Sequence, residues 1–183
     1  MQSLNDSKRY LFTSERLGFR DWKEEDIPVL AALNADPVVM EFFPSIQDYQ
    51  QTVAFVDKMQ SQFAANGYCY FAVDRLDREE CIGFIGLTDQ VYKADFTPCV
   101  DIGWRLKQSA WHNGFAKEGA SRCLEYGLKD LRLSKIYAVA PKINTRSEHI
   151  MKSIGMHKVF EFDHPALLED KRLNPCILYL KEG

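Results

Sequence analysis

The sequence has little of what marks nucleic-acid-binding and membrane proteins. Its 183 residues carry 23 Lys and Arg against 26 Asp and Glu, a net charge of −3, and the basic residues form no run. The chain therefore offers no broad positive surface for a duplex. No apolar stretch approaches the roughly 18 residues that cross a bilayer. We expect neither nucleic acid nor membrane as a partner.

Cysteine and histidine are too few and too scattered for a metal site. The five cysteines form no C-x-x-C pair, and the four histidines are never spaced i, i+4, so we expect no bound metal. An odd number of cysteines, most of them in strand-like runs, indicates reduced thiols. The polar start from Met1 to Lys8 has no signal-peptide character. Both features favour a cytoplasmic location.

The chain also lacks the two common nucleotide-binding loops, internal repeats and low-complexity tracts. Neither G-x-x-x-x-G-K-[ST] nor G-x-G-x-x-G occurs, which argues against nucleotide hydrolysis and dinucleotide binding. The 46% hydrophobic and 13% aromatic content is typical of one globular core. We expect a flexible N-terminus over residues 1–8 and a single domain over residues 9–183.

Hydrophobic periodicity predicts about seven strands and about four helices. Strands are expected at residues 12–21, 68–73, 81–88, 98–106, 135–140, 156–162 and 176–180. Helices are expected at about 24–33, 47–65, 115–131 and 145–154. The early strands are hairpin-linked, whereas the strand at 98–106, the helix at 115–131 and the strand at 135–140 require a parallel crossover. The fold class is therefore α/β (α+β), with a mixed, mostly antiparallel sheet and a central parallel β-α-β unit.

The most informative stretch runs from Trp104 to Ala120, where an apolar strand enters a polar loop and Gly114 precedes a helix. The first turn of a helix has unpaired N–H groups and partial positive charge, which suit a phosphate. Gly114 has no Cβ, so an anion can approach its backbone closely. The pattern indicates a phosphate cradle, although an ordinary strand–helix connection remains the alternative.

Four stretches together resemble one known family. They are residues 13–20, similar to a T-x-R-L-x-L-R start; residues 96–106, similar to a fourth strand and its preceding loop; residues 111–116, similar to W-G-x-G-Y-A; and residues 141–147 with Gly155 and Met156, similar to P-x-x-N-x-x-S…G-[MF]. The chain resembles the GNAT superfamily of acyl-CoA N-acyltransferases, nearest the branch of ribosomal-protein N-terminal acetyltransferases. The resemblance implies a GNAT-like fold, an enzyme, and acetyl-CoA as the acyl donor.

The resemblance also implies where acetyl-CoA binds. The pyrophosphate would lie on the N–H groups of residues 113–117, and the pantetheine arm would lie along β-strand residues 104–106 like an added strand. The implied cofactor-binding residues are Trp104, Arg105, Leu106, His112, Asn113, Gly114, Phe115, Ala116, Lys117 and Asn144. Three of them carry open alternatives. His112 stands where the branch has glycine, Lys117 can supply a point charge or face solvent, and Asn144 suits an N-cap as well as a pantetheine contact.

Two residues are candidates for catalysis. Ser147 lies one turn into its helix, where most serines are solvated, but the family match makes it a candidate for protonating or orienting the departing thiolate. Met151 stands where many relatives have a proton-donating tyrosine. Asp101 is the ionisable residue in the first half of the central strand and could deprotonate the amine through water. The alternative for Asp101 is a strand-end carboxylate that faces solvent or pairs with Arg105.

The expected reaction moves an acetyl group from acetyl-CoA to a primary amine by direct attack in a ternary complex. An α-amine with a pKa of ~7.9 is easier to deprotonate than a lysine at ~10.4 by ~3.4 kcal/mol, so a site without a strong base favours a protein N-terminus. The alternatives are a small-molecule amine acetyltransferase and a non-catalytic acyl-CoA-binding sensor.

Residues 40–49 and 89–98 would line the acceptor pocket. Their aromatic and acidic side chains suit a cationic amine or simply reflect loop composition. A monomer and a homodimer are both compatible with the sequence.

Overall fold

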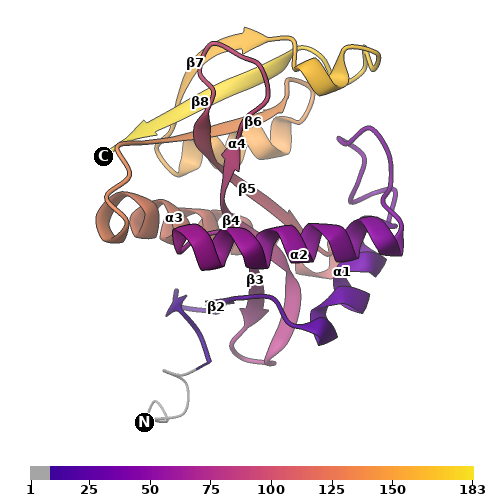
Figure 1. The fold of residues 1–183 in the computed structure, drawn as a ribbon, viewed down its shortest axis with the longest axis vertical. Coiled ribbons are helices and arrows are strands. Elements are labelled where there is room, and N and C mark those ends of the chain that lie inside the picture. Colours follow the sequence, from indigo (N-terminus) through magenta and orange to yellow (C-terminus); the bar gives the residue numbers. More distant parts are fainter. Residues whose placement is uncertain (1–8) are drawn as a thin grey trace.

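A computed structural model describes residues 9–183, and the expectation for residues 1–8 lies outside that range. Eight strands form one sheet in the order β1-β2-β3-β4-β5-β6-β8-β7, and every neighbouring pair is antiparallel except β5 and β6 (Figure 1). The strands are β1 (Phe12–Thr13), β2 (Leu17–Arg20), β3 (Tyr70–Arg75), β4 (Glu80–Gln90), β5 (Cys99–Leu106), β6 (Lys135–Pro141), β7 (His157–Phe162) and β8 (Cys176–Glu182). The predicted mixed sheet and its central parallel unit are confirmed.

Four α-helices accompany the sheet: α1 (Ile27–Asn34), α2 (Tyr49–Asn66), α3 (Phe115–Glu125) and α4 (Thr145–Ser153). Short 3-10 turns lie at Glu24–Asp26, Gln108–Ala110 and Pro165–Leu167. Within residues 9–183, no helix combines the length and apolar character that crossing a membrane requires.

Two elements differ from the sequence prediction by more than a shift of a few residues at their ends. The strand expected at 12–21 is two strands, because the chain turns back at Ser14, whose N–H donates to the Leu17 carbonyl at 2.9 Å. The helix expected to reach residue 131 ends at Glu125 and continues as a π-helical turn over Tyr126–Asp130. In that turn Leu131 donates its N–H to the Tyr126 carbonyl at 3.0 Å, five residues back.

Helices cover both faces of the sheet, and β4 is accordingly buried on both sides from Ile82 to Thr88. Neighbouring strand residues point to opposite faces, so Phe84 and Ile85 contact the helices on opposite faces of the sheet. The Phe55 ring of α2 lies 5.3 Å from the Phe84 ring, and α3 approaches Ile85 on the opposite face at Gly119. Figure 1 shows α1 and α2 in front of the strands, with β6, β7 and β8 grouped away from β2 and β3. The sheet centre is thus held between two helical layers.

A buried ion network fixes the N-terminal half. The Arg20 guanidinium of β2 lies 2.6 Å from a carboxylate oxygen of Asp26, which precedes α1, and 2.7 Å from one of Asp74 in β3. All three side chains are nearly inaccessible to solvent. A buried charge is tolerated when partners of opposite charge surround it, so this arginine is fully neutralised within the fold.

We predict that Gly119→Ala lowers the free energy of unfolding by up to about 2 kcal/mol. Alanine normally stabilises a helix over glycine by about 1 kcal/mol, but a Cβ at Gly119 would lie 2.3 Å from Cδ1 of Ile85, and overpacking a core costs about 1–3 kcal/mol. Urea unfolding measures the change. Ser121→Ala, exposed on the same helix, serves as the control, and adding Ile85→Val should recover part of the loss. Stabilisation by Gly119→Ala would show that α3 does not need this close approach.

Candidate functional site

The sheet opens between its two parallel strands. In the described structure β5 and β6 are bridged at Asp101 and Tyr137 alone. By contrast, β5 pairs with β4 along the whole length of β5, from Cys99 to Leu106. Beyond Asp101, towards Leu106, the second edge of β5 therefore has no strand partner among residues 9–183. A strand edge of this kind offers free N–H and C=O groups to a ligand.

Backbone groups of β5 alternate between β4 and this opening. The Lys107 N–H donates to the Ile82 carbonyl of the hairpin at 2.9 Å, so by alternation Arg105 also directs its backbone groups towards β4. Those of Trp104 and Leu106 then face the opening, and the Trp111 indole donates to the Leu106 carbonyl at 2.7 Å. Of the three residues expected to bind pantetheine, only Trp104 and Leu106 present backbone groups. Arg105 can contribute only its side chain.

The start of α3 forms the predicted cradle geometry. Gly114 is the N-cap with φ 78°, and the first helical hydrogen bond runs from the Glu118 N–H to the Gly114 carbonyl at 3.0 Å. The N–H groups of Phe115, Ala116 and Lys117 therefore precede the hydrogen-bonded ladder. His112 has φ 60°, a left-handed conformation that glycine adopts freely. The histidine thus keeps the backbone shape that glycine would have at this position.

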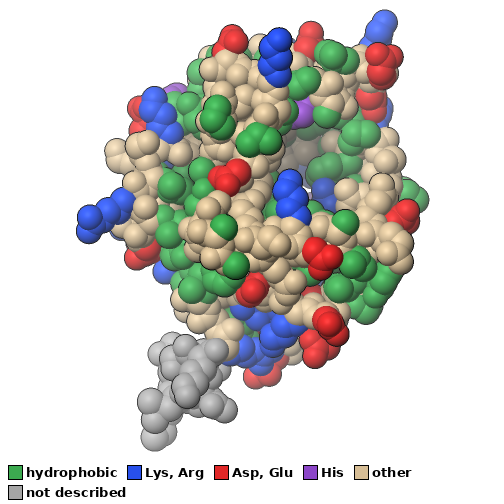
Figure 2. All heavy atoms as spheres, in the orientation of Figure 1, with side chains coloured by type: hydrophobic (Ala, Val, Ile, Leu, Met, Phe, Trp, Pro, Cys, Tyr) green, Lys and Arg blue, Asp and Glu red, His purple; other side chains and the backbone are tan. Residues whose placement is uncertain are grey.

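A cavity of about 630 Å³ lies between the β5 edge, the start of α3, the start of α4 and the loop after α1. Its volume is within the range of ligand pockets. Figure 2, which has the orientation of Figure 1, shows a hollow in the surface with hydrophobic and basic side chains around it. Of the residues predicted from sequence, the cavity is lined by Trp104, Arg105, Leu106, His112, Gly114, Phe115, Ala116, Lys117, Asn144 and Ser147.

Two predicted residues do not line this cavity. Asn113 lies on a smaller neighbouring pocket with Arg16 and Arg75, and its side-chain amide donates to the Trp111 carbonyl at 2.7 Å. Asp101 lies further along β5. The sequence analysis did not assign several other lining residues, most of which adjoin predicted ones in the chain, namely Val39, Ala110, Trp111, Thr145, Arg146, His149, Ile150 and Ser153.

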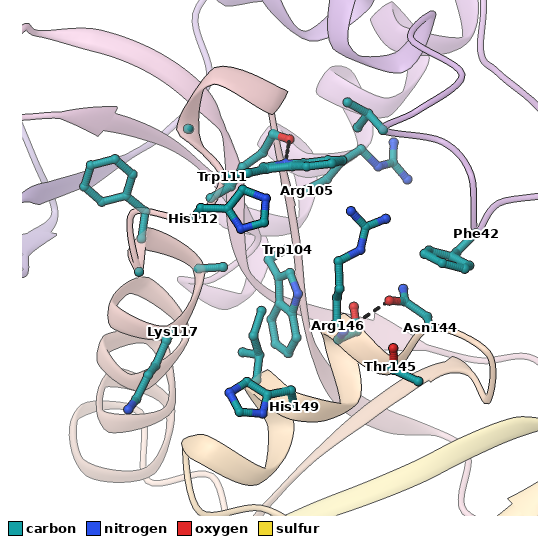
Figure 3. A pocket seen from close by; sticks show the side chains of 18 of the residues that line it. Phe42, Trp104, Arg105, Trp111, His112, Lys117, Asn144, Thr145, Arg146 and His149 are labelled. Carbon is teal, nitrogen blue, oxygen red and sulfur yellow. Dashed lines mark hydrogen bonds between the residues drawn. The ribbon is translucent and has the colours of Figure 1, made fainter.

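The N-terminus of α4 brings Asn144 and Ser147 into the cavity wall. Asn144 is the N-cap, and its Oδ1 accepts from the Ser147 N–H at 3.1 Å (Figure 3). The N-cap interpretation is correct, and a ligand contact through the amide nitrogen stays a prediction. Arg146 lies over the Trp111 ring at 4.8 Å and pairs with Glu41 at 2.9 Å. In Figure 3 the guanidinium ends of Arg105 and Arg146 lie on the same side of the cavity, while Lys117 points away from them.

Asp101 is a buried carboxylate with two donors. Its side chain accepts from the Tyr70 hydroxyl at 2.7 Å and from the Gln90 side-chain amide at 3.1 Å, and the residue is 8% exposed. Burial raises the pKa of Asp101 to about 6, while the two hydrogen bonds act in the opposite direction. The alternative of a solvent-facing carboxylate is wrong because the side chain is buried. The alternative of a pair with Arg105 is wrong because Arg105 donates to Asn34 instead. A carboxyl titrating near 6 can accept a proton at neutral pH.

Most of the acidic and aromatic side chains expected at the acceptor pocket are engaged within the protein. Asp48 caps α2 by accepting from the Gln51 N–H, and Asp89 accepts from the Tyr68 hydroxyl and the Asn66 amide. The Phe42 and Phe43 rings are covered by the Arg146 and Arg105 guanidinium groups at 5.5 and 4.1 Å. These side chains therefore do not form a free site for a cationic amine.

Comparison with known proteins gives consistent matches along the chain. Residues 16–157 match the family described as Acetyltransferase (GNAT) domain. The uncharacterised N-acetyltransferase YnaD of Bacillus subtilis is 30% identical over 147 residues, covering 80% of this chain and 82% of YnaD.

Two solved structures share the fold at low identity. A spermidine N-acetyltransferase from Vibrio cholerae, in complex with CoA and spermine, superposes with a TM-score of 0.71 at 18% identity, covering 91% of this chain and 95% of that one. The ribosomal-protein-S5-alanine acetyltransferase from Vibrio fischeri gives 0.70 at 16% identity, covering 93% and 95%.

We predict that the Asp101 carboxyl makes stability depend on pH. Folding raises its pKa from 3.8 to about 6, so between these pH values the folded chain binds this proton more tightly than the unfolded chain. The resulting stabilisation is present below pH 3.8 and is lost as pH rises through 6. Relative to Asp101→Asn, the wild type should lose on the order of 3 kcal/mol between pH 4 and pH 7. Denaturant unfolding across this range measures the difference, and a difference that does not vary with pH would contradict burial as the cause.

Proposed function

The chain belongs to the GNAT acetyltransferase family and is an acetyl-CoA-dependent acyltransferase, and from that membership we propose that it acetylates a free α-amine, with a protein N-terminus favoured as acceptor. The observation that carries the donor part of the proposal is the combination of an open β5 edge and a helix start at the same cavity, and the acceptor part rests on the buried Asp101 carboxyl. The acceptor amine attacks directly while both substrates are bound.

The described residues fit acetyl-CoA, which supplies the activated acetyl group. We assign the pyrophosphate to the N–H groups of Phe115 to Lys117, because they lack helical partners and lie at a positive helix end. We assign the pantetheine amides to Trp104 and Leu106, whose backbone groups face the opening. Asn144 can add its side-chain N–H groups from the opposite wall, since its oxygen is used by the cap.

The reaction requires two proton movements that protein groups can assist. An ammonium acceptor gives up two protons as the new C–N bond forms, and one proton ends on the sulfur as the C–S bond breaks. We assign the first deprotonation to Asp101, acting through water because it does not line the cavity. We assign delivery to the sulfur to the Ser147 hydroxyl, because Ser147 lines the cavity and Met151 is a buried, non-donating side chain.

The tuned pKa of Asp101 favours a weakly basic amine. Moving a proton from an α-ammonium of pKa ~7.9 to a carboxyl near 6 is uphill by about 2.6 kcal/mol, whereas a lysine at ~10.4 requires about 6 kcal/mol. The difference corresponds to roughly 300-fold in rate when deprotonation precedes attack. This comparison supports an α-amine over a lysine side chain.

Small-molecule acetylation is the second candidate, and among such acceptors polyamines are disfavoured by the cavity itself. The fold neighbour from Vibrio cholerae is named for spermidine. Here the two aromatic rings at the mouth are already covered by guanidinium groups, which repel a polycation. The proposal also includes the narrower resemblance to ribosomal-protein acetyltransferases. It further includes a cytoplasmic location, which is consistent with the five free cysteines.

We predict that Gly114→Asn weakens acetyl-CoA binding at least tenfold. Asparagine tolerates the left-handed conformation of Gly114 but places a side chain where the phosphate must approach the backbone. Gly67→Asn is the matched control, because Gly67, at the C-terminus of α2, has φ 77° and a Cβ there would come no closer than 3.9 Å to its nearest neighbour, Cδ2 of Leu131. Calorimetry should show lost affinity only for Gly114→Asn, with similar thermal unfolding of the two variants. Equal affinities would mean that the cradle is misplaced.

We also predict faster acetylation of peptides that offer only a free N-terminus than of peptides that offer only a lysine, by about 100-fold or more in kcat/KM. Release of CoA measures both. Asp101→Asn should remove the rate limb that rises through about pH 6, and Asp89→Asn, which removes a neighbouring carboxylate with the same kinds of donor, should preserve it. A preference for lysine would refute the α-amine assignment, and no release of CoA with any amine would favour the non-catalytic acyl-CoA-binding sensor.

A further inference from the structure

Arg105 places a positive charge in the cavity wall without a counter-ion. Its Nη1 donates to Oδ1 of Asn34 at 2.7 Å, while its Nε is buried and has no hydrogen-bond partner within residues 9–183. In the described structure it forms no ion pair, unlike the enclosed Arg20, which lies between two carboxylates. A buried cation and a buried N–H each cost free energy until a partner arrives.

The guanidinium is held rigidly in this position. Its Cζ atom lies 4.1 Å from the Phe43 ring centre and 5.2 Å from that of Phe84. Asn34 is wholly buried and oriented by its own donation to the Thr52 hydroxyl at 3.0 Å. A group fixed by stacking and by a supported hydrogen bond loses little entropy when it binds a ligand. Arg105 is therefore preorganised for an anion.

The chemistry of the side chain selects the kind of anion. Burial lowers the pKa of Arg105 to about 10, so it stays charged at neutral pH while being poorly solvated. A planar guanidinium with free N–H groups matches a carboxylate in a bidentate pair. Because the backbone of Arg105 is engaged by β4, the side chain is the part of this residue that a ligand in the cavity can meet.

The position of Arg105 relates it to the acceptor. Residues 101 and 105 lie on one face of β5, since side chains two and four apart share a face, and about 13 Å separates their Cα atoms. Trp104, which borders the donor edge, points to the other face. The Tyr70 ring covers Gly103 between these two residues, so an acceptor reaches Arg105 through the cavity, and its amine exchanges a proton with Asp101 through water.

We propose that Arg105 recognises a carboxylate on the acceptor, so that the preferred substrate is an amine that also carries a carboxylate group. This inference rests on the proposed acetyl transfer to an α-amine and narrows its acceptor class. The carboxylate can belong to an acidic side chain near a peptide N-terminus or to the C-terminus of a short peptide or amino acid.

The test compares matched acceptors. Peptides amidated at the C-terminus with Glu or Gln at positions one to three probe acidic side chains, and dipeptides with a free or amidated C-terminus probe the terminal carboxylate. The wild type should favour at least one carboxylate member of these pairs ten- to hundredfold in kcat/KM. Arg105→Met should abolish this preference by slowing only the carboxylate substrate, and Arg105→Lys should retain part of it. Arg146→Met, which removes a cavity arginine already paired with Glu41, should keep the preference.

Two binding measurements separate this proposal from the proposed function. CoA affinity, measured by calorimetry without acceptor, should be the same for wild type and Arg105→Met; a loss would assign Arg105 to the donor and overturn the proposal. Affinity for the N-acetylated Glu and Gln peptides should differ in the wild type and not in Arg105→Met. If no amine releases CoA but this difference is seen, the proposed function fails and carboxylate recognition stands. If neither rate nor binding distinguishes carboxylate from amide, carboxylate recognition is refuted.

Discussion

The site depends on one weak point in hydrogen bonding, the parallel contact between β5 and β6. Within residues 9–183 a single bridge at Asp101 and Tyr137 joins the two halves of the sheet, whereas β4 with β5 and β6 with β8 are paired over seven or eight residues. The sheet consequently opens on one side of that bridge and leaves the Trp104 and Leu106 backbone groups without strand partners in the described chain. The packing of α3 through Gly119 then places a helix start beside the open edge, so that a phosphate cradle and a free strand edge border the same cavity.

Electrostatics gives the two sides of β5 different roles. Asp101 and Arg105 are two charged groups on one face of β5, and they differ in the partners that the protein gives them. Asp101 keeps two hydrogen-bond donors, and the raised pKa adapts it to exchange a proton. Arg105 keeps a single hydrogen bond and no carboxylate. The N-terminal ion network around Arg20 shows that the fold can neutralise a buried arginine when stability alone is at stake, so the unpaired charge of Arg105 indicates a role with a ligand.

Local sequence signals predicted most of the fold, and most of the predicted site residues line the cavity. Periodicity placed the helices and strands, Gly114 marked the start of α3, and Asn144 was correctly expected as an N-cap. The sequence could not show that Ser14 breaks the first strand, or that the helix from residue 115 widens to a π turn, because long-range packing decides both. It also could not show that Tyr70 and Gln90 hold Asp101, since these residues lie on other strands. The acidic and aromatic loop residues suggested a site for cations, but most of them have partners within the protein.

The central claim is that acetyl-CoA lies between the start of α3 and the open edge of β5, and backbone amide NMR tests it most directly. On titration with CoA we expect the largest amide shifts and the strongest new protection from hydrogen exchange at Phe115 to Lys117 and at Trp104 and Leu106. The Gly103 and Arg105 amides, which face β4, should change less. Perturbation centred on β7 and β8, or equal protection of Arg105 and its two neighbours, would contradict the placement of the cosubstrate along this edge.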